Sequence, residues 1–133
     1  MSQGNVEIVR SSVEAAARND WAAAMASVDP NVAWVEMPSL GPDASTYTGT
    51  EELREAFNSW IAMWSEYDAE IARYADADDD VVVLIRERGR GGISGAVVER
   101  ELGEVFTLRE GKVVRVRLYG SWAEALDAAG LSE

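Results

Sequence analysis

The stretch AVVERELGEVFTLREGKVVRVRLY, residues 96–119, decides the fold of this chain. Two β-rich runs are interrupted by Arg-Glu-Gly at residues 109–111, which fits a three-residue hairpin loop whose glycine takes the left-handed conformation. The stretch therefore predicts two long antiparallel strands, residues 96–108 and 112–119, joined by a tight turn.

The turn also sets the pairing of the two strands. If Leu108 faces Lys112, then Glu104 faces Val116, and side chains alternate between the two faces. One face then carries Leu102, Glu104, Phe106, Leu108, Val114, Val116 and Leu118. The opposite face carries Glu99, Glu101, Arg115, Arg117 and Tyr119, a mixed polar set that suits solvent or a partner subunit.

Glu104 is the one acidic residue on the apolar face of this hairpin. A carboxyl group placed there loses its water, so its pKa should rise and it must find a partner or be protonated. Residues 32–37 form a second β-rich segment, in which Val32, Trp34 and Glu36 share one face. Two glutamates that point into one interior, Glu36 and Glu104, are our candidate catalytic pair.

An ordinary structural role for these glutamates remains open. An inward glutamate beside an arginine is often a buried ion pair, and Arg86, Arg88 or Arg100 could supply that partner. Trp60 and Trp64 are likewise open to two interpretations, because they could be core residues of a helix or could wall a cavity between that helix and the sheet.

The rest of the chain predicts helices first and strands last. Helical spacing over residues 5–18, 21–27 and from 48 onward predicts three helices, the last with Leu53, Phe57, Trp60, Ile61 and Trp64 along one stripe. The proline- and turn-rich residues 38–48 predict a loop. Strands are expected at residues 67–74 and 81–90, and Ser121 to Glu124 is a capping box that opens a short terminal helix. This order predicts an α+β fold, in which the helices pack on one face of a curved sheet that contains a four-stranded meander.

Composition limits the chemistry. The 133 residues fit one domain spanning 1–133 and hold 24 acidic and 12 basic side chains, with no cysteine and no histidine. The formal charge of −12 argues against nucleic acid as a partner. Without histidine or cysteine, every Ser-His or Cys-His triad and every His or Cys metal site is excluded, and the sequence indicates neither a metal nor a cofactor.

No segment indicates a membrane or an export route. The longest apolar run, residues 81–85, is too short to span a bilayer, and the N-terminal residues carry no targeting pattern. We therefore expect a cytoplasmic protein with no membrane association.

Several motifs together resemble the SnoaL-like members of the nuclear transport factor 2-like superfamily, which includes ketosteroid isomerases, polyketide cyclases and limonene epoxide hydrolases. The resemblance covers nearly the whole chain and lies in residues 5–10, 19–21, 29–34, 47–53 and 105–113. It implies a cone-shaped α+β barrel in which a curved antiparallel sheet wraps around a long helix. It also implies a cavity for a small hydrophobic molecule and a homodimer through the outer face of the sheet.

The resemblance assigns roles to individual positions. Glu36 falls where ketosteroid isomerases keep their carboxylate base, and Glu104 falls where they keep a protonated acid that donates to the enolate oxygen. Their catalytic tyrosine falls on Ser12, a poorer donor, and the aspartates of the epoxide hydrolases fall on Arg88 and Leu118. The residues expected to contact the ligand are Ser12, Trp34, Trp60, Trp64, Arg86, Val116 and Leu118.

Three functions remain compatible with the sequence. The first is a cofactor-independent isomerase, cyclase or lyase that moves a proton on a hydrophobic carbonyl compound, with Glu36 as base and Glu104, with Ser12 or Arg86, stabilising the oxyanion. The second is a non-catalytic binding module in which arginines neutralise the glutamates. The third is a dimeric accessory protein whose interior is closed by tryptophans.

Overall fold

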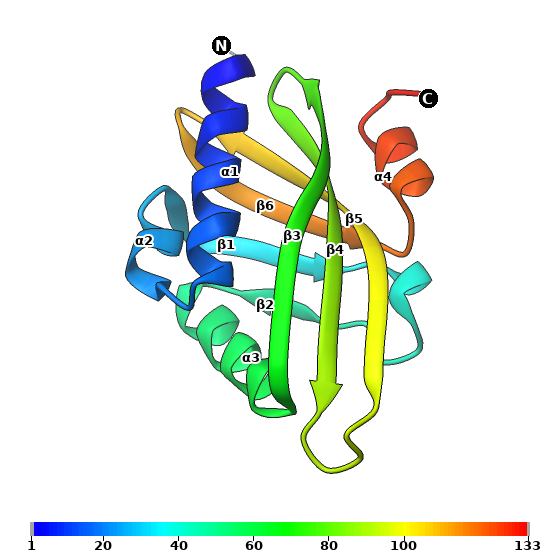
Figure 1. Ribbon diagram of the computed structural model, residues 1–133. Coiled ribbons are helices and arrows are strands. Elements are labelled where there is room, and N and C mark those ends of the chain that lie inside the picture. Colours follow the sequence, from blue (N-terminus) through cyan, green and yellow to red (C-terminus); the bar gives the residue numbers. More distant parts are fainter. Residues whose placement is uncertain (1, 133) are drawn as a thin grey trace.

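The computed structural model describes residues 2–132, which form a curved sheet with helices on both of its faces (Figure 1). In chain order the elements are α1 (Ser2–Ala17), α2 (Trp21–Met25), β1 (Val28–Glu36), the 3₁₀ turn η1 (Pro38–Leu40), β2 (Thr46–Thr48), α3 (Thr50–Ala62), β3 (Trp64–Ala77), β4 (Asp80–Gly91), β5 (Val97–Arg109), β6 (Lys112–Tyr119) and α4 (Trp122–Ala128). The expected α+β fold is confirmed.

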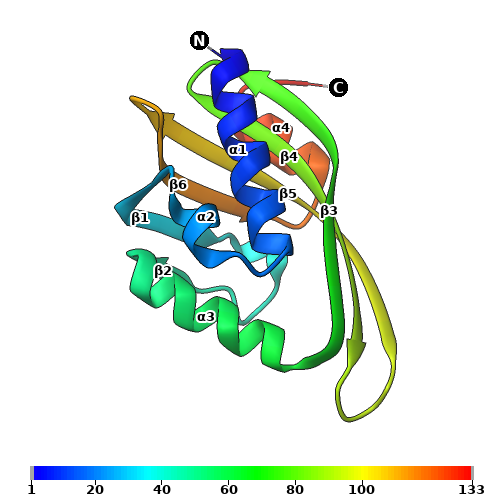
Figure 2. The same cartoon turned by 60° about the vertical axis from the view of Figure 1, so that its left-hand side comes forward.

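The strand order of the sheet is β2-β1-β6-β5-β4-β3. Strands β3 to β6 form the expected meander, and β1 pairs in parallel with β6, the last strand of the chain. This parallel pairing brings residues 28–36 beside residues 113–118, so the sheet is mixed rather than wholly antiparallel. Figure 2 shows α1, α2 and α3 on the concave side, while α4 lies on the other side of the strands.

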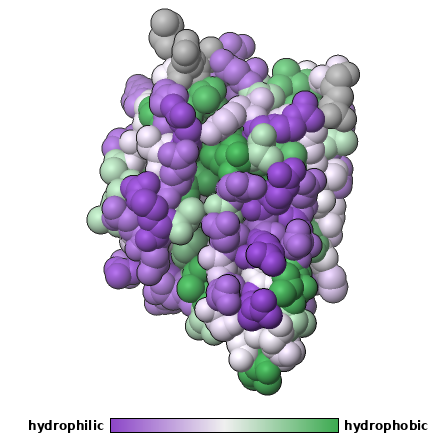
Figure 3. All heavy atoms as spheres, viewed as in Figure 1, coloured by the Kyte–Doolittle hydropathy of each residue, from purple (hydrophilic) through white to green (hydrophobic). Residues whose placement is uncertain are grey.

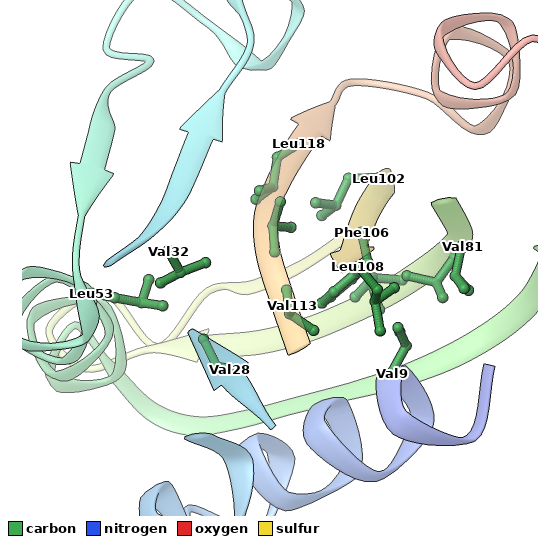
Figure 4. Close-up of a cluster of buried hydrophobic side chains, with 13 residues drawn as sticks. Val9, Val28, Val32, Leu53, Val81, Leu102, Phe106, Leu108, Val113 and Leu118 are labelled. Carbon is green, nitrogen blue, oxygen red and sulfur yellow. The ribbon is translucent and has the colours of Figure 1, made fainter. Parts of the chain in front are cut away.

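The main core lies between the concave face and the helices. Val9 from α1 and Leu53 from α3 point toward side chains of β1, β5 and β6 (Figure 4). A smaller cluster on the convex face joins Val82 and Val105 to Ala125 and Leu126 of α4. The convex face is therefore not wholly polar, because α4 covers part of it.

The pairing of β5 with β6 differs from the expected register. Arg109 pairs with Lys112, and the loop between them is the two-residue Glu110-Gly111, in which both residues have positive φ. This is the conformation of a type I′ turn, so the loop is one residue shorter than the sequence suggested.

A bulge near Val114 shifts the register by one further residue, so Glu104 pairs with Leu118 instead of Val116. The two shifts add to two residues, which is the period of side-chain alternation in a strand. The inward side chains of β5 therefore still pair with inward side chains of β6, and Glu104 stays on the concave face. Val113 replaces Val114 as the inward residue at the start of β6.

Two other expectations are wrong in detail. Residues 38–48 are not only a loop, because they contain η1 and the short edge strand β2. Trp64 does not lie on the long helix, which ends at Ala62, and instead begins β3. No helix within residues 2–132 is long and apolar enough to cross a membrane.

An exposed apolar tip lies where α3 ends and β4 turns into β5. Met63, Ile93, Val97 and Val98 are all exposed, and the amide of Gly92 donates to the carbonyl of Met63. Apolar spheres are visible at the lower tip in the space-filling view (Figure 3), where Figure 1 places the β4–β5 connection.

Candidate functional site

A cavity of about 570 Å³ lies between the concave face of the sheet and the helices. Side chains from α1, α2, α3 and strands β1 to β6 line it, together with the segment that follows η1. Six of the residues expected at the site are among them: Ser12, Trp34, Glu36, Trp60, Glu104 and Leu118.

Glu36 and Glu104 lie in one row across the sheet. Glu36 on β1 pairs with Leu118 on β6, and Leu118 pairs with Glu104 on β5. Two strand spacings separate the glutamates, which corresponds to roughly 10 Å between their Cα atoms. Both side chains line the cavity, so a small molecule beside Leu118 would lie between the two carboxyl groups.

Glu104 is buried, with 7% of its surface exposed. Within residues 2–132 its carboxyl group forms no hydrogen bond and no salt bridge. Burial, and then the charge of Glu87, raise the pKa of Glu104 from 4.5 to about 8, while Arg100 acts in the opposite direction. Glu104 is therefore a neutral acid at pH 7 that can donate a hydrogen bond into the cavity.

Glu36 is half-buried at the end of β1. The amide of Ser45 donates to Oε1 of Glu36 at 3.0 Å, which fixes the carboxylate and leaves Oε2 without a hydrogen bond among the described residues. Trp34 lies two residues before Glu36 on the same face and pairs with Tyr47 of β2. Glu36 therefore keeps an acceptor oxygen and lines the cavity together with Trp34 and Tyr47.

A second polar group in the cavity joins Tyr67, Glu87 and Arg100. The hydroxyl of Tyr67 donates to Oε2 of Glu87, and both Nε and Nη2 of Arg100 lie 2.7 Å from Oε1 of the same carboxylate. The guanidinium also lies over the ring of Trp60, 5.3 Å from its centroid. Burial, and then the charge of Glu87, raise the pKa of Tyr67 far above its ordinary value, so its hydroxyl keeps its proton.

Sequence reasoning missed most of this group, although alternation could have found it. Glu87 follows Val83 and Ile85 at a spacing of two on β4, and Arg100 precedes Leu102 and Glu104 at the same spacing on β5. Arg100 was one of three candidate partners for an inward glutamate, but its partner is Glu87.

Three residues expected to contact the ligand do not line the cavity. Arg86 lies on the convex face, where Glu101 and Glu70 pair with it, because alternation turns it away from Glu87. Val116 is buried in the core between the helices and the sheet. Trp64 packs on Gly89, where an added Cβ would lie 2.7 Å from the indole ring, and it supports Trp60 and Tyr67 from behind.

Ser12 lines the cavity, but its hydroxyl already donates its proton to another protein group. The hydroxyl donates to the carbonyl of Ala24 at 2.7 Å, which ties α1 to α2. Ser12 can therefore offer the cavity only an acceptor oxygen. No group of three or more acidic side chains within residues 2–132 has the geometry of a metal site.

A known protein family covers most of this chain. The model of the SnoaL-like domain matches residues 9–116. No curated protein gives a significant match. A nuclear transport factor 2-like protein of Burkholderia thailandensis is similar in structure, with a TM-score of 0.78, 29% identity, and coverage of 91% of this chain and 95% of that chain.

Two further solved structures share the fold. A protein from Catenulispora acidiphila with a ketosteroid isomerase-like fold, solved in complex with trimethylamine, has a TM-score of 0.73 and 19% identity over 94% of this chain and 93% of that chain. A putative SnoaL-like polyketide cyclase from Jannaschia has a TM-score of 0.72 and 21% identity over 89% of this chain and 85% of that chain. The family match and these structures agree on one assignment: the chain belongs to the SnoaL-like domain family and has a nuclear transport factor 2-like fold.

Proposed function

We propose that the protein binds a small hydrophobic carbonyl compound in the cavity and catalyses a cofactor-independent proton transfer on it, as an isomerase, cyclase or lyase. The observation that carries this proposal is the row Glu36–Leu118–Glu104, in which a half-buried carboxylate and a buried neutral acid face the same space. A base and an acid at the two ends of one cavity suit the conversion of a ketone into its enolate.

In this mechanism Oε2 of Glu36 removes a proton from the carbon next to the carbonyl group. The carboxyl group of Glu104 donates a hydrogen bond to the carbonyl oxygen as negative charge develops there. In an isomerase, Glu36 then returns the proton to a different carbon. In a cyclase, the enolate carbon adds to a second carbonyl carbon of the substrate, and the resulting alkoxide oxygen takes the proton from Glu36. In a lyase, the group on the β-carbon leaves with its bonding electron pair and takes that proton.

The structure alters the expected set of oxyanion donors. Arg86 lies outside the cavity, and the proton of Ser12 is bound to Ala24, so Glu104 alone remains of the expected donors. Tyr67 adds none, because its hydroxyl donates to Glu87. The proposed reaction therefore depends on one acid and one base.

Relatives offer further support. The family includes polyketide cyclases and isomerases, and the similar protein from Catenulispora acidiphila was solved with a small organic molecule. Neither Glu36 nor Glu104 forms a salt bridge with an arginine in the described part of the chain, which favours the catalytic hypothesis over a module with neutralised glutamates.

Hydrogen exchange at the carbon next to a ketone tests the proposal without a known product. A panel of hydrophobic ketones is incubated with the protein in D₂O, and deuterium uptake is followed by NMR. We expect the protein to accelerate exchange for at least one ketone, and Glu36→Gln to reduce that acceleration about 10²–10⁴-fold, which is the usual contribution of a positioned base.

Glu55→Gln is the matched control, because it makes the same chemical change on the exposed side of α3, and Glu55 neither lines the cavity nor lies on the convex face. It should exchange ketones at the wild-type rate. Acceleration by Glu36→Gln equal to that of the wild type would remove Glu36 from the mechanism. Binding of a ketone without any acceleration would favour the alternative, a non-catalytic binding protein.

We also propose that the protein forms a homodimer through the part of the convex face that α4 leaves uncovered. Glu99, Glu101 and Arg115 are exposed there, and Arg115 has no salt-bridge partner among residues 2–132. Exposed polar groups of both charges suit the rim of an interface between two copies.

A further inference from the structure

We propose that the cavity accepts uncharged ligands and excludes anionic ones, and that Glu87 enforces this selection by neutralising the guanidinium of Arg100. The inference rests on the cavity being the binding site of the proposed function. It makes that function narrower, since the substrate would be a neutral carbonyl compound rather than a keto acid, a phosphate ester or a thioester of an anionic carrier.

The charges around the cavity support this selection. Of the described residues that line it, four carry carboxyl groups, namely Glu36, Asp43, Glu87 and Glu104, whereas Arg100 is the single base. With Glu104 neutral at pH 7, three carboxylates face one guanidinium. An anionic ligand would therefore meet excess negative charge in a space that is partly shielded from water.

Arg100 cannot easily serve as an anion site. Two of its nitrogen atoms are held on Oε1 of Glu87, and the ring of Trp60 covers the guanidinium. Turning Arg100 toward a ligand would leave the carboxylate of Glu87, whose side chain is 13% exposed, without its charged partner. Tyr67 holds the other oxygen of Glu87 and so fixes the carboxylate in the orientation that binds Arg100.

Three further polar side chains of the cavity, Ser12, Tyr67 and Glu104, bring no positive charge to an anion. Ser12 and Tyr67 donate their hydroxyl protons to protein oxygens. Glu104 can donate one hydrogen bond, which serves a carbonyl oxygen, but it brings no positive charge. A neutral molecule with one acceptor oxygen fits this arrangement better than a carboxylate, a sulfonate or a phosphate does.

Two fluorescent probes with one skeleton test the inference. N-phenylnaphthylamine is neutral, and anilinonaphthalene sulfonate adds a sulfonate to the same rings; both fluoresce more strongly in apolar surroundings. We expect the wild type to bind the neutral probe at least tenfold more tightly than the sulfonate at pH 7. Glu87→Gln should free Arg100 and tighten sulfonate binding at least tenfold, with little effect on the neutral probe.

Two further variants complete the design. Glu55→Gln removes the same charge on the exposed side of α3, outside the cavity, and should bind both probes as the wild type does. Asp43→Asn removes a negative charge from an exposed cavity residue, and should tighten sulfonate binding severalfold even if Glu87→Gln does not fold.

The outcomes separate the two proposals. If the wild type binds neither probe, the cavity is not a binding site for such molecules and the proposed function is overturned. If it binds both probes equally, the exclusion of anions is overturned while the proposed function stands. If the wild type discriminates but neither Glu87→Gln nor Asp43→Asn changes the ratio, the selection does not arise from these carboxylates and the inference is wrong.

Discussion

A carboxyl group that is buried without a hydrogen-bond partner must be neutral to stay buried, and Glu104 is in this situation. Its environment is apolar on both neighbouring strands, where Val83 of β4 and Leu118 of β6 are its pairing partners. The residue is therefore costly to ionise, which is a reason to expect its acid form to have a use.

The folded state binds the proton of Glu104 more tightly than the unfolded state does, because its pKa is about 8 rather than 4.5. Stability should therefore fall as the pH rises from about 5 to 8, by an amount of the order of a few kcal/mol. In Glu104→Gln, which mimics the neutral acid, this loss should disappear. Urea unfolding of both proteins at pH 5, 6.5 and 8 measures the difference.

The remaining carboxylates titrate in both proteins, so the comparison isolates Glu104. A wild-type stability that falls no more steeply than that of Glu104→Gln over this range would mean that Glu104 is ionised in the folded state. It could not then act as the acid of the proposed reaction.

The position of a single site residue could be predicted where the alternation of inward and outward side chains along its own strand determines which face it occupies. Glu36 and Glu104 could be placed in the cavity because each interrupts an apolar face. Arg86 was expected in the cavity, but the alternation of Val83, Ile85 and Glu87 along β4 places it on the opposite face. The hydrogen bond of Ser12 to Ala24 could not be predicted, since it depends on how α2 folds back against α1.

At the scale of elements, α4 is held against the sheet at one very close contact. An added Cβ on Gly103 of β5 would lie 2.6 Å from the carbonyl oxygen of Ser121 and 2.6 Å from Cβ of Ala125. No side chain can be accommodated there unless α4 moves away from Val105, which it covers.

Gly103→Ala should therefore lower the free energy of unfolding by about 1–3 kcal/mol, as overpacking usually does. The matched control is Gly4→Ala in α1, where an added Cβ meets nothing within 4 Å and should be neutral or slightly stabilising. Urea unfolding measures both. Equal stability of Gly103→Ala and the wild type would show that α4 is free to shift.

The limits of prediction at this scale have a common cause. Apolar residues recur at regular spacings within the helices and within the strands of the meander, so these elements could be predicted from the sequence. The edge strand β2 has three residues and no such pattern, and it forms because β1 offers it a partner. The bulge at Val114 is also set by pairing, which explains why the face of Glu104 was right although its partner was wrong.

At the scale of the molecule, the candidate site depends on the pairing of the first strand of the chain with the last one. The parallel pairing of β1 with β6 places Glu36 two strands from Glu104, although 68 residues separate them. Local patterns in the sequence cannot specify this contact, and the family resemblance implied an antiparallel sheet rather than this parallel pairing. The chemistry proposed for the cavity thus depends on the most non-local contact of the sheet.

The assembly of the molecule provides the last prediction. In a two-fold dimer through the convex face, one substitution changes the interface twice. Arg115→Glu replaces a positive charge on this face by a negative one, in a protein whose net charge is already −12, so it should raise the dissociation constant at least tenfold. Sedimentation velocity over a range of concentrations measures this, with Arg54→Glu on the exposed side of α3 as the control of equal charge. A wild type that sediments as a monomer throughout, or a dimer weakened equally by both variants, would place the convex face outside any interface.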